Sequence, residues 1–185
     1  MRCTIMRIGL GGAITAIVML GVAGTAPAAT CTVTPSATEG PFYTPGAPTR
    51  ARIATPGTTG TPLVLRGVVR DSSCRPVAGA IVDMWQADGT GHYDNDGYRL
   101  RGKVRTNATG AWTIRTVVPG IYPGRTEHIH VKVGAPGGPV VTTQLYLPGS
   151  SGNAGDAFFQ RPLLIRDLNR SSTPWTGTYP FVVRR

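Results

Sequence analysis

The feature that most constrains the fold of this chain is a series of short apolar runs that alternate with turn sequences from residue 62 onward. None of these runs keeps a helical period for long, and several are rich in β-branched residues, which is typical of strands. We predict strands over residues 63–70, 80–86, 111–118, 128–134, 140–147, 158–165 and 180–183. Short strands at this spacing predict an all-β fold, namely a β-sandwich.

Composition and local pattern divide the chain into segments. The 25 glycines and 16 prolines, with only 15% charged residues, indicate a turn-rich β protein and not a helix bundle. Residues 29–61 contain many Pro, Gly and Thr with little periodicity, which predicts an irregular N-terminal arm. Residues 62–185 are predicted to form one sandwich domain, because the chain is long enough to bury a single core.

The first 28 residues have the pattern of a secretory signal peptide. Arg2 and Arg7 form a basic start, residues 8–22 are apolar and uncharged, and residues 26–28 (Ala-Pro-Ala) fit the small-residue cleavage rule. An uncleaved membrane anchor is the alternative, since the apolar run approaches spanning length. The glycines in the run favour cleavage, so we expect a secreted, extracellular protein that does not remain at the membrane.

The chain is basic, with a formal net charge of +10. Removing the two arginines of the predicted signal, which contains no acidic residue, leaves +8 (10 − 2). Such a charge can attract anionic aromatic compounds or an acidic polymer, and it is equally compatible with ordinary basicity of a secreted protein. Because the sequence has no basic cluster interleaved with aromatic residues, nucleic acid is not an expected partner.

Two cysteines remain outside the predicted signal, which contains Cys3. Cys31 and Cys74 would then share an oxidising compartment, where pairs of cysteines form disulfides. A bridge between them would join the N-terminal arm to the domain. Two separate thiols are the alternative.

His128 and His130 are the strongest candidates for a functional site. Residues two apart on a strand point to the same face, so the two imidazoles project together while Ile129 points toward the core. Tyr93 and Tyr122 could complete a metal site, and such a set of two tyrosines and two histidines suits a hard ferric ion.

Each of these residues also has a simpler interpretation. A single buried tyrosine is usually a packed aromatic side chain, and a His-x-His pair can lie on a surface or hold zinc or copper. Glu127 would point away from the histidines on a regular strand, which argues against a ferrous site with two histidines and one carboxylate. His92 faces the opposite way from Tyr93 on an extended chain, so we expect it to be solvated.

Four segments together resemble the intradiol ring-cleavage dioxygenases, which open catechols between the two hydroxyl-bearing carbons. The segments are TEGPFYTPGAP (38–48), GVVRDSSCRPVAGAIVDMWQADGTGHY (67–93), YPGRTEHIHVKV (122–133) and TTQLYLPG (142–149). The resemblance covers residues 31–160 and is closest to the short secreted members. It departs from the larger cytoplasmic members at Gly124, where they carry tryptophan, and this leaves the preferred substrate open.

The resemblance implies a role for each candidate residue. Four side chains are implied as ligands of non-haem Fe(III): Tyr93, Tyr122, His128 and His130. Tyr122 is the implied axial, displaceable ligand, Arg125 lies beside the bound ring, and Gln144 packs and hydrogen-bonds near it. Tyr43 is a further candidate for contact with the substrate from the arm, with simple packing as the alternative.

The implied activity is that of a secreted enzyme that inserts both atoms of O2 into a catechol and yields a cis,cis-muconate-type diacid. Its expected partners are a small aromatic diol and O2. Two alternatives remain: a zinc or copper enzyme that uses the His-x-His pair, and an inactive β-sandwich with a binding or structural role. The choice among catechols and the oligomeric state stay open, with a homodimer as one alternative.

Overall fold

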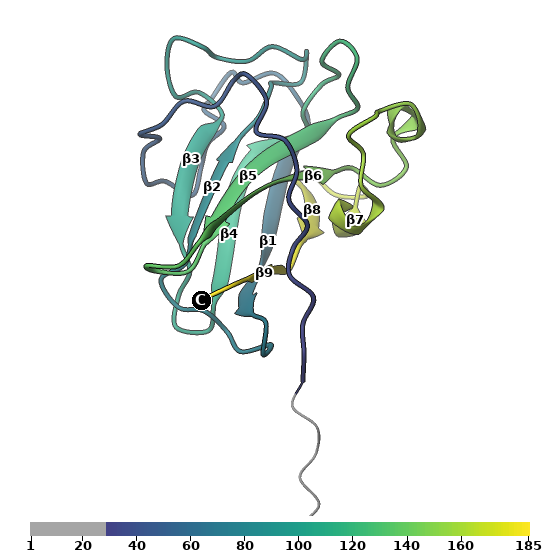
Figure 1. Ribbon diagram of the computed structural model, residues 1–185. Coiled ribbons are helices and arrows are strands. Elements are labelled where there is room, and N and C mark those ends of the chain that lie inside the picture. Colours follow the sequence, from purple (N-terminus) through teal and green to yellow (C-terminus); the bar gives the residue numbers. More distant parts are fainter. Residues whose placement is uncertain (1–28) are drawn as a thin grey trace, which may run out of the picture.

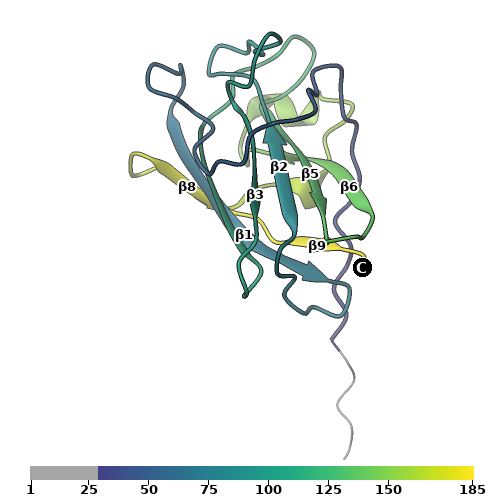
Figure 2. The same cartoon turned by 90° about the vertical axis from the view of Figure 1, so that its left-hand side faces the viewer.

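A computed structural model describes residues 29–185, which form two β-sheets packed face to face (Figures 1 and 2). The first sheet has the order β4-β1-β8-β7, with β9 also paired to β1, and the second has the order β3-β2-β5-β6. The strands are β1 (Pro62–Asp71), β2 (Ile81–Trp85), β3 (Arg101–Arg105), β4 (Ala111–Val117), β5 (His128–Gly134), β6 (Val140–Tyr146), β7 (Arg166–Asn169), β8 (Trp175–Thr178) and β9 (Phe181–Val183). The predicted all-β sandwich is thus confirmed.

Six of the seven predicted strands correspond to β1, β2, β4, β5, β6 and β9. The strand predicted over residues 158–165 is wrong, because this segment contains the 3₁₀ turn η2 (Arg161–Leu163) with Pro162 inside it. Proline has no N–H to donate to a sheet ladder, and its fixed φ suits the first turn of a helix. The sequence pattern did not predict β3, β7 or β8.

The two faces of β5 have different surroundings. Ile129, Val131 and Val133 are fully buried between the sheets, where β-branched side chains pack well on a pleated surface. His128 and His130 point to the opposite face of the same strand. In register, β2 places Trp85 opposite His130 on one side of β5, and β6 runs along the other side.

The segment 29–61 covers part of this outer face. The N–H of Ala37 donates to the carbonyl of Thr142, and the Thr143 hydroxyl donates to the carbonyl of Pro35, so the segment crosses β6. Further along, isolated bridges join residue 49 to β3 and residue 52 to β4. This covering explains why both histidines are buried although they do not face the core.

Near its N-terminal end, this segment is joined to the domain by a disulfide between Cys31 and Cys74. The predicted signal peptide, residues 1–28, lies outside the described residues. Within residues 29–185 no helix has the length and apolar character needed to cross a membrane. The two helical elements of this range are the short 3₁₀ turns η1 (Ser151–Ala154) and η2.

Candidate metal centre

The two histidines of β5 bring their Nε2 atoms together. His128 and His130 are 4% and 2% exposed, and their Nε2 atoms lie 3.1 Å apart. The strand fixes this geometry, because alternate residues of an extended chain project from the same face. The His130 ring also stacks on Trp85, with 4.9 Å between centroids and 8° between planes. Gly40 of the arm packs against the other edge of His130, where an added Cβ would lie 3.2 Å from Cε1.

Both imidazoles are in the neutral form that binds metals. His128 Nδ1 lies 2.7 Å from the carbonyl oxygen of Thr126, so Nδ1 carries the donated proton and Nε2 keeps its lone pair. Burial lowers the pKa of His128 to about 4, against the raising effect of the Thr126 carbonyl. Burial, and then the electrostatic effects of His128 and Arg125, hold the pKa of His130 well below its usual range.

Tyr93 adds an oxygen donor to the two nitrogens. It lies in the loop between β2 and β3, and its hydroxyl oxygen is 3.4 Å from His128 Nε2. Burial raises the pKa of Tyr93, while the positive charges of Arg125 and Arg101 oppose this rise. The phenol therefore keeps its proton at neutral pH unless a bound cation replaces that proton.

Tyr122, from the loop between β4 and β5, belongs to the same aromatic cluster. Its ring lies edge-on to Tyr93, with 6.1 Å between centroids, and edge-on to Phe42 at 5.3 Å. Phe42 stacks on Tyr93 at 4.4 Å, so the arm closes the cluster from one side. The structure thus brings all four predicted ligands to one end of the sandwich, with Tyr122 half-buried.

The loops that carry the two tyrosines touch through their backbones. Gly91 has a φ of +87°, and a Cβ there would lie 2.1 Å from the carbonyl oxygen of Ile121. Gly120 donates its N–H to the carbonyl of Asp88 at 2.7 Å. Because only glycine fits at these contacts, the loops can meet closely enough to place Tyr93 beside Tyr122.

Arg101, which no sequence pattern marked, holds the loop that carries Tyr93. Its guanidinium is buried, with the residue 1% exposed, and it donates to the carbonyls of Asp94 and Phe42. One buried cation thereby ties the Tyr93 loop to the arm. Its sequence context, a charged segment with little apolar pattern, offered no sign of this role.

Arg125 lies beside the centre and is itself held on two sides. Its Nε donates to both carboxylate oxygens of Asp156, at 3.1 and 2.9 Å, and its Nη2 donates to Gln144 Oε1 at 2.6 Å. The guanidinium carbon lies 4.8 Å from the centre of the Phe158 ring. Asp156 lies in a loop without periodicity, and Phe158 begins the segment wrongly predicted as a strand, so no sequence pattern placed either residue beside Arg125.

Gln144 is fully buried on β6, directly opposite His130 in the strand register. Its Oε1 accepts from Arg125 and from the Tyr146 hydroxyl, and its Nε2 donates to the carbonyl of Thr38. These bonds use both ends of the amide. Gln144 therefore links the arm to Arg125, and these protein contacts leave its amide fixed in place.

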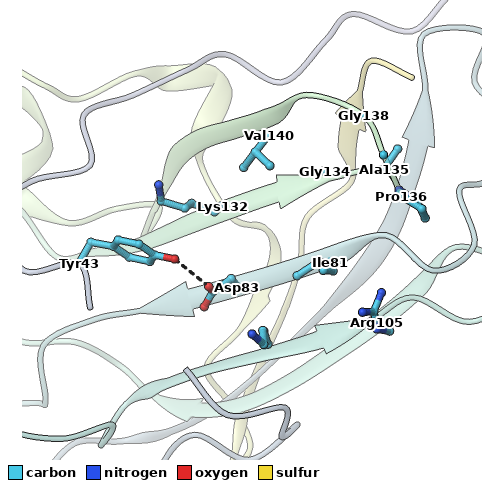
Figure 3. Close-up of a pocket in the computed structure, with 12 residues that line it drawn as sticks. Tyr43, Ile81, Asp83, Arg105, Lys132, Gly134, Ala135, Pro136, Gly138 and Val140 are labelled. Carbon is cyan, nitrogen blue, oxygen red and sulfur yellow. Dashed lines mark hydrogen bonds between the residues drawn. The ribbon is translucent and has the colours of Figure 1, made fainter. Parts of the chain in front are cut away.

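Tyr43 does not point to the histidine pair. Its hydroxyl donates to Asp83 Oδ2 at 3.3 Å, and Lys132 Nζ lies 4.3 Å from its ring centre (Figure 3). Tyr43 lines a separate groove of about 540 Å³ on the outer face of the second sheet. Trp85 lies between, with its ring 4.7 Å from Tyr43 and 4.9 Å from His130. The described contacts of Tyr43 are thus those of a packed side chain, and its contact with substrate stays a prediction.

The donor set fits a hard trivalent metal ion. Within residues 29–185, no group of three or more His, Cys, Asp or Glu side chains is placed to hold a metal, and the oxygen donor beside the histidine pair is the Tyr93 hydroxyl. Glu127 bonds instead to the hydroxyls of Thr126 and Ser150. Two neutral imidazoles and phenolic oxygen are ligands that stabilise Fe(III).

Known proteins are similar to this chain in sequence and in fold. The family described as Dioxygenase matches residues 38–174. A catechol 1,2-dioxygenase of Acinetobacter lwoffii is 34% identical over 142 residues, covering 63% of this chain and 52% of that protein. A 6-chlorohydroxyquinol 1,2-dioxygenase of Cupriavidus pinatubonensis is 34% identical over 166 residues, covering 76% of this chain and 59% of that protein. The chain thus spans little more than half the length of these relatives.

One solved structure matches this chain over nearly the full length of the solved domain. The dioxygenase domain of a dioxygenase–carbohydrate-binding protein fusion from the cellulolytic bacterium Streptomyces sp. SirexAA-E is 46% identical, with a TM-score of 0.80. The match covers 83% of this chain and 99% of that domain. With the matched family and the shared sandwich, these relatives show that the chain belongs to the intradiol ring-cleavage dioxygenases.

Proposed function

We propose that this protein is a non-haem Fe(III) dioxygenase that opens catechol-type rings with O2 to cis,cis-muconate-type diacids. The observation that carries the proposal is the convergence of His128 Nε2, His130 Nε2 and the Tyr93 hydroxyl beside a fixed Arg125. Family membership supports it, since the similar proteins include dioxygenases named for catechol and for 6-chlorohydroxyquinol.

Tyr93, Tyr122, His128 and His130 would hold the iron. When bound, ferric iron supplies a Lewis acid that favours a doubly deprotonated catechol and its reaction with O2. The phenolic oxygen of Tyr122, which the family resemblance implies as the displaceable ligand, would accept one of the two catechol protons. Phe42 and Trp85 keep water away from the histidines by packing on Tyr93 and His130.

Arg125 supplies positive charge for the reacting ring. A guanidinium stays protonated at any working pH, and its donors remain fixed when they are held by other side chains. Negative charge that develops on the ring during cleavage would be stabilised by such a preorganised donor. Gln144 contributes by holding Arg125 through its Oε1 atom and the arm through its Nε2 atom.

We also infer that the protein is secreted. The basic and apolar pattern of residues 1–28 supports export, and the disulfide between Cys31 and Cys74 suits an oxidising compartment. Its substrates would then be small aromatic diols outside the cell. A free-thiol count and the N-terminal sequence of protein recovered from the culture medium would test this inference.

Metal content, colour and oxygen uptake test the enzymatic proposal together. We expect about one ferric ion per chain, a reddish colour from tyrosinate-to-iron charge transfer, and O2 consumption with at least one of catechol, protocatechuate and hydroxyquinol. The variant His130→Ala should lose most of its iron and activity. His92→Ala is the matched control, because His92 is exposed and bonds to Thr90 and not to the centre.

Other outcomes would contradict the proposal in different ways. Iron-free protein that consumes O2 with catechols at the full rate would remove the metal from the mechanism. A colourless zinc or copper protein would favour the alternative metal sites. Iron-loaded protein that is inert toward all catechols would favour a binding or structural role.

A further inference from the structure

The buried carboxylate of Asp156, which bonds to Arg125, has hydrogen-bond donors on both of its oxygens. The side chain of Asp156 is 0% exposed, and the loop that carries it lies between η1 and η2. Its oxygens accept four bonds: from Arg125 Nε at 3.1 and 2.9 Å, from the Thr126 N–H at 2.9 Å and from the Phe158 N–H at 2.8 Å. Backbone donors thus fix the carboxylate independently of the arginine.

The contacts of Arg125 leave one edge of its guanidinium available. Nε is used by Asp156 and Nη2 donates to Gln144, while the Phe158 ring lies 4.8 Å from the guanidinium carbon. Among residues 29–185, the acceptors that bond to Arg125 take Nε and Nη2, and Nη1 donates to none of them. A guanidinium has five N–H donors in one rigid plane, so holding Nε and Nη2 also sets where Nη1 points.

We propose that Asp156 is a positioning residue, which holds Arg125 so that the Nη1 edge of the guanidinium faces the ring bound at the metal centre. This inference rests on the proposed function of that site. Arginine has a long, flexible side chain, and a charge that must be placed during the reaction stabilises less than one that is already in place. Asp156 can fix it because Thr126, which donates to Asp156, directly follows Arg125 in the chain.

A buried ion pair could instead serve stability alone. The two roles differ in what a variant changes: loss of a stabilising pair lowers the melting temperature, whereas loss of a positioning contact lowers kcat in protein that is still folded and loaded with iron. The test must therefore compare Asp156 with another nearly buried carboxylate that accepts similar hydrogen bonds elsewhere in the fold.

Asp71 provides that control. Its carboxylate is also nearly buried and accepts from two backbone N–H groups, of Ser73 and Arg75, and from Arg75 Nε at 3.0 Å. It is the last residue of β1, and the end of β1 lies at the opposite end of the sandwich from the end of β2, which is Trp85 (Figure 2). Asp71→Asn therefore removes a similar set of bonds without touching the metal centre.

Asp156→Asn should keep its iron content and colour and lose kcat by about 10–100-fold, the usual effect of removing a partner that orients a site residue. KM for the best catechol should change less than kcat. Asp71→Asn should lower the melting temperature but leave kcat unchanged. Unchanged kcat in folded, iron-loaded Asp156→Asn would overturn the proposal.

A double-mutant cycle adds a stricter criterion. If Asp156 acts through Arg125, then adding Asp156→Asn to Arg125→Leu should lower kcat little further than Arg125→Leu does alone. If the two substitutions instead lower kcat by the product of their separate effects, Asp156 does not act through the arginine, and the proposal is wrong.

A measurement without substrate separates this inference from the proposed function. In metal-free protein, the NMR signal of the Arg125 Nε–H should be slow to exchange with water, and Asp156→Asn should make its exchange at least tenfold faster. Asp71→Asn should leave it unchanged. Wild-type protein that consumes no O2 with any catechol would refute the proposed function, while an unprotected Arg125 Nε–H in wild type would refute the positioning role.

Discussion

The contact between the two tyrosine loops gives a quantitative prediction for Gly91→Ala. A Cβ at Gly91 would lie 2.1 Å from the carbonyl oxygen of Ile121, whereas real Cβ atoms essentially never approach closer than 3.0 Å. The loops must therefore separate by about 0.9 Å (3.0 − 2.1) at this point. Tyr93 follows two residues after Gly91, and Tyr122 follows directly after Ile121, so the movement reaches both tyrosines.

Two costs add in this variant. A non-glycine residue at the positive φ of Gly91 costs about 1–2 kcal/mol, and forcing an extra group into a packed contact costs about 1–3 kcal/mol. The free energy of unfolding should thus fall by about 2–5 kcal/mol. Because the displaced backbone carries Tyr93 and Tyr122, the folded fraction should also bind iron more weakly and show a shifted absorption band.

Gly124→Ala is the matched control. Gly124 lies two residues after Tyr122 with a φ of +79°, but no atom lies within 4 Å of the position that its Cβ would take. It should therefore lose only the conformational part, about 1–2 kcal/mol, and keep its iron. Urea denaturation and iron titration of the two variants measure the difference. Equal losses of stability and equal iron binding in Gly91→Ala and Gly124→Ala would show that the loop contact does not place the tyrosines.

Three further predictions concern the ligands, the disulfide and acid stability. Tyr122→Phe should retain much of its iron but change colour and lose turnover, whereas Tyr93→Phe should lose more iron; the reverse order of iron content would exchange their roles. Reducing the bridge between Cys31 and Cys74, 43 residues apart, should lower the free energy of unfolding by about 4 kcal/mol, and no change on reduction would contradict this. Burial works to raise the pKa of Asp71, but the hydrogen bonds from Arg75 and the backbone lower this pKa below its usual range. The stabilisation from the Asp71 carboxylate is therefore present above its unfolded pKa of about 3.9 and is lost as the pH falls through the lower folded pKa. Asp71→Asn should therefore reduce the drop in melting temperature below about pH 4, and an unchanged drop would count against this ion pair.

Local pattern predicted the strands whose side chains alternate or that are rich in β-branched residues. β3 was not predicted because Arg101–Arg105 has the sequence Arg-Gly-Lys-Val-Arg, which contains few apolar residues. It becomes a strand through its backbone pairing with β2 and with residue 49 of the arm. Residues 158–165 gave the opposite error, a strand predicted where there is a turn, since an apolar run around Pro162 can pack in a turn against the core as well as in a strand.

The residues of the candidate metal centre were likewise predicted only in part. A period of two placed His128 and His130 together, and the resemblance to a family placed Tyr93 and Tyr122 with them. Asp156 could not be found in this way, because its role depends on how a loop closes onto Arg125 31 residues earlier in the chain. For Tyr43 the sequence left packing and substrate contact open, because it does not reveal on which side of Trp85 the ring lies.

The covering of the histidine face by the arm has a consequence for the order of events during biosynthesis. Thr38 of the arm contacts Gln144, which the ribosome adds 106 residues later. Proteins are made from the N-terminus at about 5–20 residues per second, so the arm waits for several seconds before its docking surface exists. Until then the ring of His130 lacks its packing contact with Gly40. Closure of the arm is therefore among the last steps that complete the surroundings of His130.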